Sequence, residues 1–168
     1  MRVINNHKRI LKQSKDDVSK VFKTLGTPED KIWPYENWPA IKFKEGIKHG
    51  SKGGHGRIRY TIIKFEEDNS IKFRFYEPEG FNGTHEFKIK SIDHITTEIS
   101  HVIQMKTTIK ASFFWVFVIR WLHDALIEEA FDKVENHFST KIKTTKYSFW
   151  VIFLREIYKR KTFKTKHA

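Results

Sequence analysis

The sequence predicts an α+β domain in which a curved antiparallel sheet wraps around one long helix toward the C-terminal end. Between residues 56 and 105, four runs show the residue alternation of strands and are joined by short turn-forming segments. They are followed by residues 111–138, whose apolar residues recur at helical spacing. Gripping the helix in the hollow of the sheet buries the apolar faces of both elements at once.

The chain is expected to begin with a strand and a short helix. The segment VINNHKRIL (3–11) has an extended character and only partial alternation. Ser14 stands at a helix N-cap position, and Asp16 and Asp17 follow in the first turn, where carboxylates complement the helix dipole. The pattern therefore predicts a strand over this segment and a helix that ends near Leu25.

The next part of the chain has turn and loop chemistry. Gly26 is placed to end the helix, and Pro28 to open a second, smaller helical turn. WPYENWP (33–39) predicts an ordered loop, because its prolines interrupt regular structure and its tryptophans anchor it. GIKHGSKGGHG (46–56) is rich in glycine, but it lacks the Gly-Lys-Ser/Thr ending of a phosphate-binding loop and leads into a strand. We expect a flexible turn there rather than a phosphate cradle.

Alternation assigns faces to the four strand-like runs, because successive strand side chains point to opposite sides. The runs are GRIRYTIIKF (56–65), SIKFRFYE (70–77), GTHEFKIKS (83–91) and ITTEISHVIQM (95–105). The positions expected to face inward are Ile71, Phe73, Phe75, Phe87, Ile89, Ile95, Thr97, Ile99, Ile103 and Met105. His85 and His101 fall on the same face, and a three-residue turn over 92–94 would make them direct cross-strand neighbours.

Residues 111–138 predict one long amphipathic helix. Its apolar stripe consists of Trp115, Ile119, Leu122, Leu126, Ala130 and Val134. Its opposite side carries Asp124, Glu128, Asp132 and Glu135. His123 lies near the centre of the apolar stripe, so its ring is expected to face the sheet, whereas Asp124 should point to water. The aromatic residues of SFFWVFVIRWL (112–122) spread around the helix and need a cover, for which YSFWVIFL (147–154) is the candidate.

The net charge of +12 is concentrated at one end of the chain. Residues 139–168 hold nine basic residues and one acidic residue, a net charge of +8. The other residues hold 23 bases and 19 acids, a net charge of +4. A nucleic-acid module more often spreads basic residues over a folded face, so we expect no specific nucleic-acid partner. The distribution predicts a domain over 1–138 and a basic, aromatic extension over 139–168.

Cysteine is absent, which excludes disulfides and thiolate chemistry. The first residues, MRVINNHKRI, lack the apolar core of a secretory signal, and the sequence has no apolar run of the roughly 18 residues that a membrane-spanning helix needs. A cytoplasmic location is therefore expected, with peripheral attachment at a membrane as the alternative.

Four segments resemble proteins of the START-like or birch-pollen-allergen-like superfamily, also called SRPBCC proteins, in particular an uncharacterised bacterial subgroup. They are WPYENWP, GSKGGHGRIRY, EPEGFNGTHEF and RWLHDALIEEAFDKVE, in that order along residues 1–138. The resemblance implies a helix-grip fold with an apolar cavity between the long helix and the sheet. It also implies binding of lipids, sterols, polyketides or other hydrophobic ligands, with or without a reaction. No reaction is assigned to the subgroup, so the resemblance supplies no catalytic residue.

The hypothesis from the sequence is a carrier or sensor of a small hydrophobic ligand. The residues expected to line its site are His85, His101, His123, Phe73, Phe75, Phe87, Ile99, Trp115, Ile119, Leu122 and Leu126. The three histidines are expected to orient a polar group of the ligand in an otherwise apolar pocket.

Several alternatives remain open beside this hypothesis. Three inward imidazoles could bind zinc, but their spacing matches no short metal motif and no inward carboxylate accompanies them, so we expect no metal or other cofactor. A cyclase, dehydratase or hydrolase could use one of them as an acid or base, but we expect a binding protein rather than an enzyme. The extension could dock on the domain, or residues 147–166 could lie on an anionic membrane.

Overall fold

The structure is a computed structural model that describes residues 1–165, with side chains described up to residue 158. The strands are β1 (Arg2–Leu11), β2 (Lys42–Phe43), β3 (Lys52–His55), β4 (Ile58–Glu66), β5 (Ser70–Glu77), β6 (Phe81–Ser91) and β7 (Thr97–Thr107). The helical elements are α1 (Lys15–Phe22), α2 (Ile109–Phe114), η1 (Trp115–Ile119), α3 (Arg120–His137) and α4 (Phe149–Thr165). This is the predicted α+β architecture.

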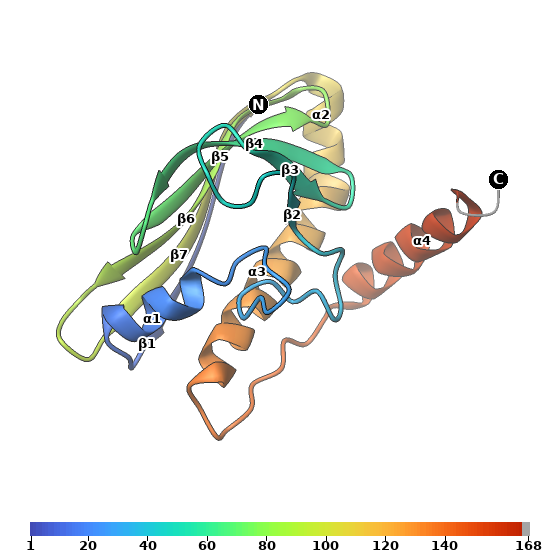
Figure 1. Cartoon of the computed structure of the whole chain (residues 1–168). Coiled ribbons are helices and arrows are strands. Elements are labelled where there is room, and N and C mark those ends of the chain that lie inside the picture. The colour runs from blue at the N-terminus through green and yellow to red at the C-terminus, as the bar shows by residue number, and fades with distance from the viewer. Residues whose placement is uncertain (166–168) are drawn as a thin grey trace.

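One antiparallel sheet of seven strands forms the body of the molecule, in the order β1-β7-β6-β5-β4-β3-β2. The long helical segment crosses one face of the sheet, and α1 lies toward the end of that face where α3 finishes (Figure 1). Irregularities in the β4–β5 pairing, at Arg59/Tyr60 and at Ile62/Lys64, bend this part of the sheet. The concave face therefore surrounds the helix, as the helix-grip arrangement requires.

The predicted register of the β6–β7 hairpin is wrong by two residues. Phe87 lies opposite His101, and His85 lies opposite Ile103, so the two histidines are diagonal rather than direct neighbours. The connection spans residues 92–96 and is closed by a bond from Ile92 N to Thr96 O, 2.9 Å long. Because a slip of two keeps every side chain on its own face, both imidazoles still point inward. Ile95, predicted to face inward, lies in this loop and is 73% exposed.

The glycine-rich segment contains a strand that the sequence did not predict. β3 runs between β2 and β4 where the backbones come unusually close. A side chain at Gly53 would place its Cβ 2.1 Å from Lys42 O, and one at Gly54 would place it 2.0 Å from Ile58 O. Glycine at these two positions therefore allows β3 to lie close to β2 and to β4.

The N-terminal helix begins as predicted and ends earlier. The Ser14 hydroxyl accepts from Asp17 N at the N-cap, and α1 ends at Phe22 rather than near Leu25. A turn continues from there to Gly26, whose φ of 73° suits glycine. Residues after Pro28 form turns and no helix, and WPYENWP is the expected ordered loop.

The long helix is continuous but contains a π-turn, η1, between α2 and α3. Widening one turn frees backbone carbonyls from their usual partners. Two indole N–H groups bond to carbonyls here, Trp121 Nε1 to Val116 O and Trp150 Nε1 to Phe117 O, each at 3.0 Å. The second bond ties the start of α4 to the π-turn.

The interior consists of two apolar clusters rather than one. The larger cluster joins the middle and C-terminal part of α3, through Leu126, Ile127 and Phe131, to α1 and the central strands. The smaller cluster gathers Trp115 with Val3, Phe81, Ile103, Met105 and Ala111. Phe75 packs against both clusters and marks the boundary between them.

Four carboxylates of α3 contact β1: Asp124, Glu128, Asp132 and Glu135. The prediction that Asp124 points to water is therefore wrong. Arg9 donates to Asp132 at 2.9 Å, to Glu135 at 2.8 Å and to Glu128 at 3.0 Å. Asp132 is only 8% exposed. Because β1 is an edge strand, its inward side chains reach past the sheet to the flank of the helix, and this row of ion pairs fixes α3 against the sheet.

The extension docks on the domain over its described part. Tyr147 donates to Glu129, and Arg155 donates to Asn37 O at 2.8 Å and stacks over the Trp38 ring. Beyond these contacts α4 projects away from the body (Figure 1). The side chains of residues 159–166, which carry much of the predicted membrane-binding charge, lie outside the described residues. Among the described residues, no helix combines the length and apolar character needed to cross a bilayer.

We predict that Arg9→Met lowers the free energy of unfolding by about 3 kcal/mol, because it leaves the buried Asp132 without a cation and takes one of two basic partners from Glu128 and from Glu135, which keep His7 and Lys143. The matched control is Lys8→Met on the outer face of β1, whose pair with Glu98 at 3.4 Å is exposed. That change should cost about 0.5 kcal/mol or less. Urea unfolding of both variants makes the comparison, and equal losses would show that the ion-pair row does not hold the helix.

Candidate functional site

The three predicted histidines do come together, between the two apolar clusters. His85 projects from β6, His101 from β7 and His123 from α3, so the sheet supplies two rings and the helix the third. Ring centroids are 5.3 Å apart for His85 and His101, and 5.0 Å apart for His101 and His123. His85 and His101 are buried, with 5% and 2% of their surface exposed.

Aromatic rings form the walls around the imidazoles. Phe73 and Phe75 stack on His85 with centroids 4.5 and 4.7 Å away. Phe87 lies 4.4 Å from His101, and Trp115 lies 6.1 Å from His123. These four aromatic residues were predicted to line the site, and each one contacts a predicted histidine.

The remaining predicted residues divide between the apolar clusters. Ile99 and Leu126 are buried in the larger cluster, and Ile119 packs against the smaller one. Leu122 is half-buried on α3, one residue before His123. Phe75, Ile119 and Leu122 are half-buried, whereas the residues of the two clusters are buried.

Four imidazole nitrogens in this group are buried and have no hydrogen-bond partner. They are Nε2 of His85, Nδ1 of His101, and both ring nitrogens of His123. A buried polar atom without a partner costs about 1–3 kcal/mol, so protein interiors rarely retain one without a use. The unpartnered nitrogens are therefore the feature of the interior that most clearly points to a ligand.

A hydrogen bond between His85 and His101 determines whether their other ring nitrogens, His85 Nε2 and His101 Nδ1, can donate or accept a hydrogen bond. These two are called the outer nitrogens. His85 Nδ1 and His101 Nε2 are 3.2 Å apart, so one of them donates and the other accepts. A neutral imidazole carries one N–H and one bare nitrogen. Whichever ring donates, the two outer nitrogens then present one donor and one acceptor.

Burial keeps both of these imidazoles neutral. The loss of solvent lowers the pKa of His85 and of His101 well below 6.5, and neighbouring imidazoles lower both values further. Among the described residues, neither ring has a hydrogen bond or ion pair with a carboxylate. The pair can exchange hydrogen bonds with a neutral polar group without any charge being buried.

Two residues near the site, Tyr60 and His55, were not predicted from the sequence. They form a row of ring contacts from His85 to the edge of the sheet. The Tyr60 ring lies 4.6 Å from His85, and its hydroxyl lies 3.2 Å from His55 Nδ1. His55 lies in the glycine-rich segment, where no alternation reveals which face a side chain takes. Tyr60 follows its strand's alternation and could have been predicted to face inward.

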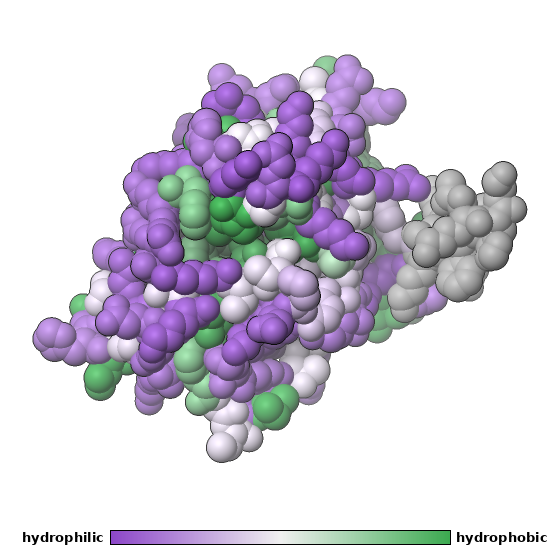
Figure 2. Space-filling model, in the orientation of Figure 1, coloured by the Kyte–Doolittle hydropathy of each residue, from purple (hydrophilic) through white to green (hydrophobic). Residues whose placement is uncertain are grey.

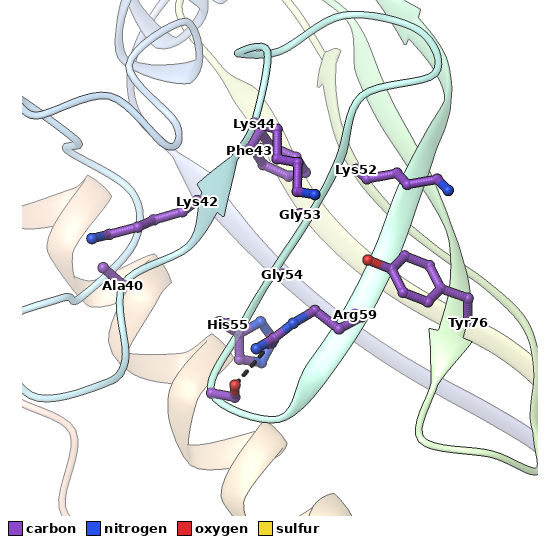
Figure 3. Close-up of a pocket in the computed structure, with 11 residues that line it drawn as sticks. Ala40, Lys42, Phe43, Lys44, Lys52, Gly53, Gly54, His55, Arg59 and Tyr76 are labelled. Atoms are coloured by element: carbon purple, nitrogen blue, oxygen red, sulfur yellow. Dashed lines mark hydrogen bonds between the residues drawn. The ribbon is translucent and has the colours of Figure 1, made fainter. Parts of the chain in front are cut away.

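Two hollows open at the β2–β3 edge. The first, about 360 Å³, is lined by Ala40, Lys42, Phe43, Lys44, Lys52, Gly53, Gly54, His55, Gly56, Arg59 and Tyr76 (Figure 3). The second, about 440 Å³, is lined by Gly26, Thr27, Pro28, Asp30, Trp33, Tyr35, Ala40, Ile41, Lys42 and Phe43. Neither is lined by a residue predicted from the sequence. Hydrophobic atoms show at the floor of a recess in this face, with hydrophilic atoms around it (Figure 2).

Several solved structures share this fold. A protein from Thermobifida fusca matches with a TM-score of 0.64 and 8% identity over 85% of this chain and 99% of that one. Norcoclaurine synthase from Thalictrum flavum matches with a TM-score of 0.62 and 13% identity over 83% and 98% of the two chains. A START superfamily protein from Mycobacterium smegmatis matches with a TM-score of 0.55 and 9% identity over 83% and 100%. These likenesses confirm the helix-grip fold, and at such identities they show the fold alone.

Sequence comparison adds no family assignment. No family model matches the chain. A segment of 64 residues is 38% identical to human cyclin-dependent kinase 11B and covers 38% of this chain. The chain spans 8% of the length of that kinase, so the match does not assign the kinase's activity to it.

We predict that the protein loses stability as the pH falls from 6.5 to 5, and that His85→Phe reduces this loss. His85 stays neutral in the folded protein, whereas its unfolded-state imidazole gains a proton below a pH of about 6.5. The unfolded state then binds more protons, so stability falls with pH by up to about 1.4 kcal/mol per pH unit for this residue.

Urea unfolding at several pH values measures this slope for the original chain and for His85→Phe. His94→Phe is the control, because it removes an imidazole from an exposed loop. Its slope should match that of the original chain. An unchanged slope in His85→Phe would mean that His85 is protonated alike in both states.

Proposed function

We propose that the protein binds a small, largely apolar ligand that carries a hydroxyl or a similar neutral polar group. The observation that carries the proposal is the set of unpartnered imidazole nitrogens among aromatic walls. Apolar walls with few convergent polar groups are typical of small-molecule sites. The START-like fold supports the same class of function, since such folds typically hold a ligand cavity between helix and sheet.

A hydroxyl group fits the histidine pair because it both donates and accepts hydrogen bonds. The outer nitrogens of His85 and His101 offer one donor and one acceptor in either tautomeric arrangement. An ether, halide or carboxylate could satisfy only the donor. The proposed ligand therefore places its hydroxyl among the imidazoles and its apolar part between the two clusters, beside Phe75, Ile119 and Leu122.

We propose binding rather than catalysis. A general base or acid is usually held by a third group that orients its ring. His85 and His101 have each other and aromatic faces, and no carboxylate orients either of them among the described residues. His123 Nδ1 lies 3.6 Å from Asp124 Oδ1, beyond ordinary hydrogen-bond distance. Carriage or sensing of the ligand requires only the hydrogen bonds and the apolar walls.

We predict that octan-1-ol binds about 10- to 100-fold more tightly than 1-chlorooctane. Displacement of a neutral fluorescent probe such as N-phenyl-1-naphthylamine measures both affinities. The factor corresponds to about 1–3 kcal/mol for satisfying a buried polar group. In the double variant His85→Phe/His101→Phe, the preference for the alcohol should disappear, because both ligands then meet apolar rings.

The control for this experiment is His49→Phe/His94→Phe, which removes two exposed imidazoles. It should retain the full preference. Equal affinity of the two ligands for the original chain would refute the role of the imidazoles. A probe that does not bind the original chain at all would refute the ligand site itself.

A second candidate function is attachment to an anionic membrane surface. Large apolar side chains remain exposed on α2 and η1, where Phe113 is 63% and Phe117 is 56% exposed, and on α4, where Phe149 is 81% exposed. The bond from Trp150 to Phe117 O joins these two elements side by side. The extension's net charge of +8 complements anionic lipids.

We predict that Phe149→Ser/Phe153→Ser reduces binding to phosphatidylserine-containing vesicles about 10-fold or more, because insertion of each aromatic ring contributes roughly 1–2 kcal/mol. Ile142→Ser, in the exposed connection before α4, is the matched control and should bind like the original chain. Cosedimentation at low salt measures the effect, and equal partitioning of the three proteins would rule out membrane contact through this face.

A further inference from the structure

A second polar cluster lies beside the imidazole group, between β1 and the first turns of α3. It contains Asn5 and His7 from the edge strand, and His123 and Asp124 from the helix. One ligand atom from each of His7, His123 and Asp124 lies within 4.8 Å of the other two. Asp124 was predicted to point to water, away from His123, but its Oδ1 lies 3.6 Å from His123 Nδ1.

The spacing of these atoms suits ligands of a single metal ion. His7 Nε2 and Asp124 Oδ1 are 3.0 Å apart. Two ligand atoms on a tetrahedral zinc ion, each about 2.0–2.1 Å from the metal, lie about 3.3 Å from one another. The two measured distances, 3.0 and 3.6 Å, lie on either side of this value.

Unpartnered atoms in the cluster point to a missing ligand. His123 Nε2 and Asn5 Oδ1 are buried without a hydrogen-bond partner, and His123 Nδ1 has only the 3.6 Å contact with Asp124 Oδ1. Asn5 Nδ2 donates to Asp124 Oδ1 at 2.9 Å, which places the amide against the same carboxylate oxygen. Imidazole nitrogen and carboxylate or amide oxygen are donors that divalent transition metals accept.

His7 has the partner that an imidazole ligand normally has. Its Nδ1 lies 2.7 Å from Glu128 Oε1, and its Nε2 is hydrogen-bonded to Asp124 Oδ1 at 3.0 Å, a bond that a metal ion held by both residues would replace. A metal-bound histidine typically donates its second N–H to a carboxylate, which fixes the ring and leaves the other nitrogen free to bind. Glu128 is placed to act as this orienting residue.

We propose that His7, His123 and Asp124 bind one Zn²⁺ ion, oriented by Glu128. Three protein ligands leave a coordination position for a water molecule or a polar ligand atom. This site differs from the zinc hypothesis drawn from His85, His101 and His123, because His7 and Asp124 take the place of His85 and His101. The zinc site shares His123 with the imidazole group, whereas the proposed ligand hydroxyl contacts the nitrogens of His85 and His101, so the two proposals are tested with different variants.

The test is zinc binding to the full chain after treatment with a chelator, measured by calorimetry. The original chain should bind one Zn²⁺ per molecule, and zinc should raise its melting temperature. His123→Phe and Asp124→Asn should each weaken binding by more than the roughly 10- to 100-fold loss expected from Glu128→Gln, which changes only the orienting residue.

His85→Phe is the matched control, since it removes a neighbouring buried imidazole outside the proposed ligand set. It should keep the affinity and the melting-temperature rise of the original chain. The proposal is overturned if the original chain binds no zinc, or if His123→Phe binds it as tightly while His85→Phe does not. Should Asp124→Asn fail to fold, His123→Phe and Glu128→Gln still decide the outcome.

Discussion

The fit of α3 against the edge strand β1 is the constraint on which the rest of the structure depends. Arg9 reaches three carboxylates on the helix, and His7 reaches two. These contacts set the rotation of the helix about its axis. The rotation in turn determines that His123 meets His101 rather than an apolar position of the sheet. A helix held only by apolar packing could turn slightly at little cost, whereas a row of part-buried ion pairs defines one position.

That position has a consequence for the interior. The two apolar clusters do not merge, because a layer of imidazoles lies between them, bordered by Phe75. Apolar side chains of similar size would fill the same space without unpartnered atoms, and would stabilise the fold better. The chain thus places neutral polar rings where stability alone would favour hydrocarbon, and this is the pattern expected where a site has been built at the expense of stability.

Much of the fold follows from the sequence because face assignment survives errors of register. Phe87 and Ile99 were placed inward by alternation, and the β6–β7 register error of two residues left them there. Because the error is an even number of residues, His85 and His101 also stay on the inward face, where they lie next to each other. Strands β2 and β3 were not predicted because a short glycine-rich strand has no alternating pattern; its signal is close backbone approach, visible only once its neighbours are known.

The cluster at β1 could not be predicted for a different reason. Asn5, His7 and Arg9 occupy alternate positions, and Asp124, Glu128, Asp132 and Glu135 recur at helical spacing, but each pattern alone looks like a solvated face. Only the pairing of β1 with β7 at the sheet edge brings the two rows together. Charged residues on an edge strand and on a helix flank can satisfy each other only in the folded chain, so their burial is a tertiary property.

The central claim is that the imidazole layer receives the polar group of an apolar ligand. A high-resolution crystal structure of the full chain grown with octan-1-ol tests it most directly. The account predicts density for the alcohol between the two clusters, with its oxygen within hydrogen-bond distance of His85 Nε2 or His101 Nδ1. The account would be contradicted if the alcohol were absent or bound elsewhere and both nitrogens were hydrogen-bonded only to protein atoms.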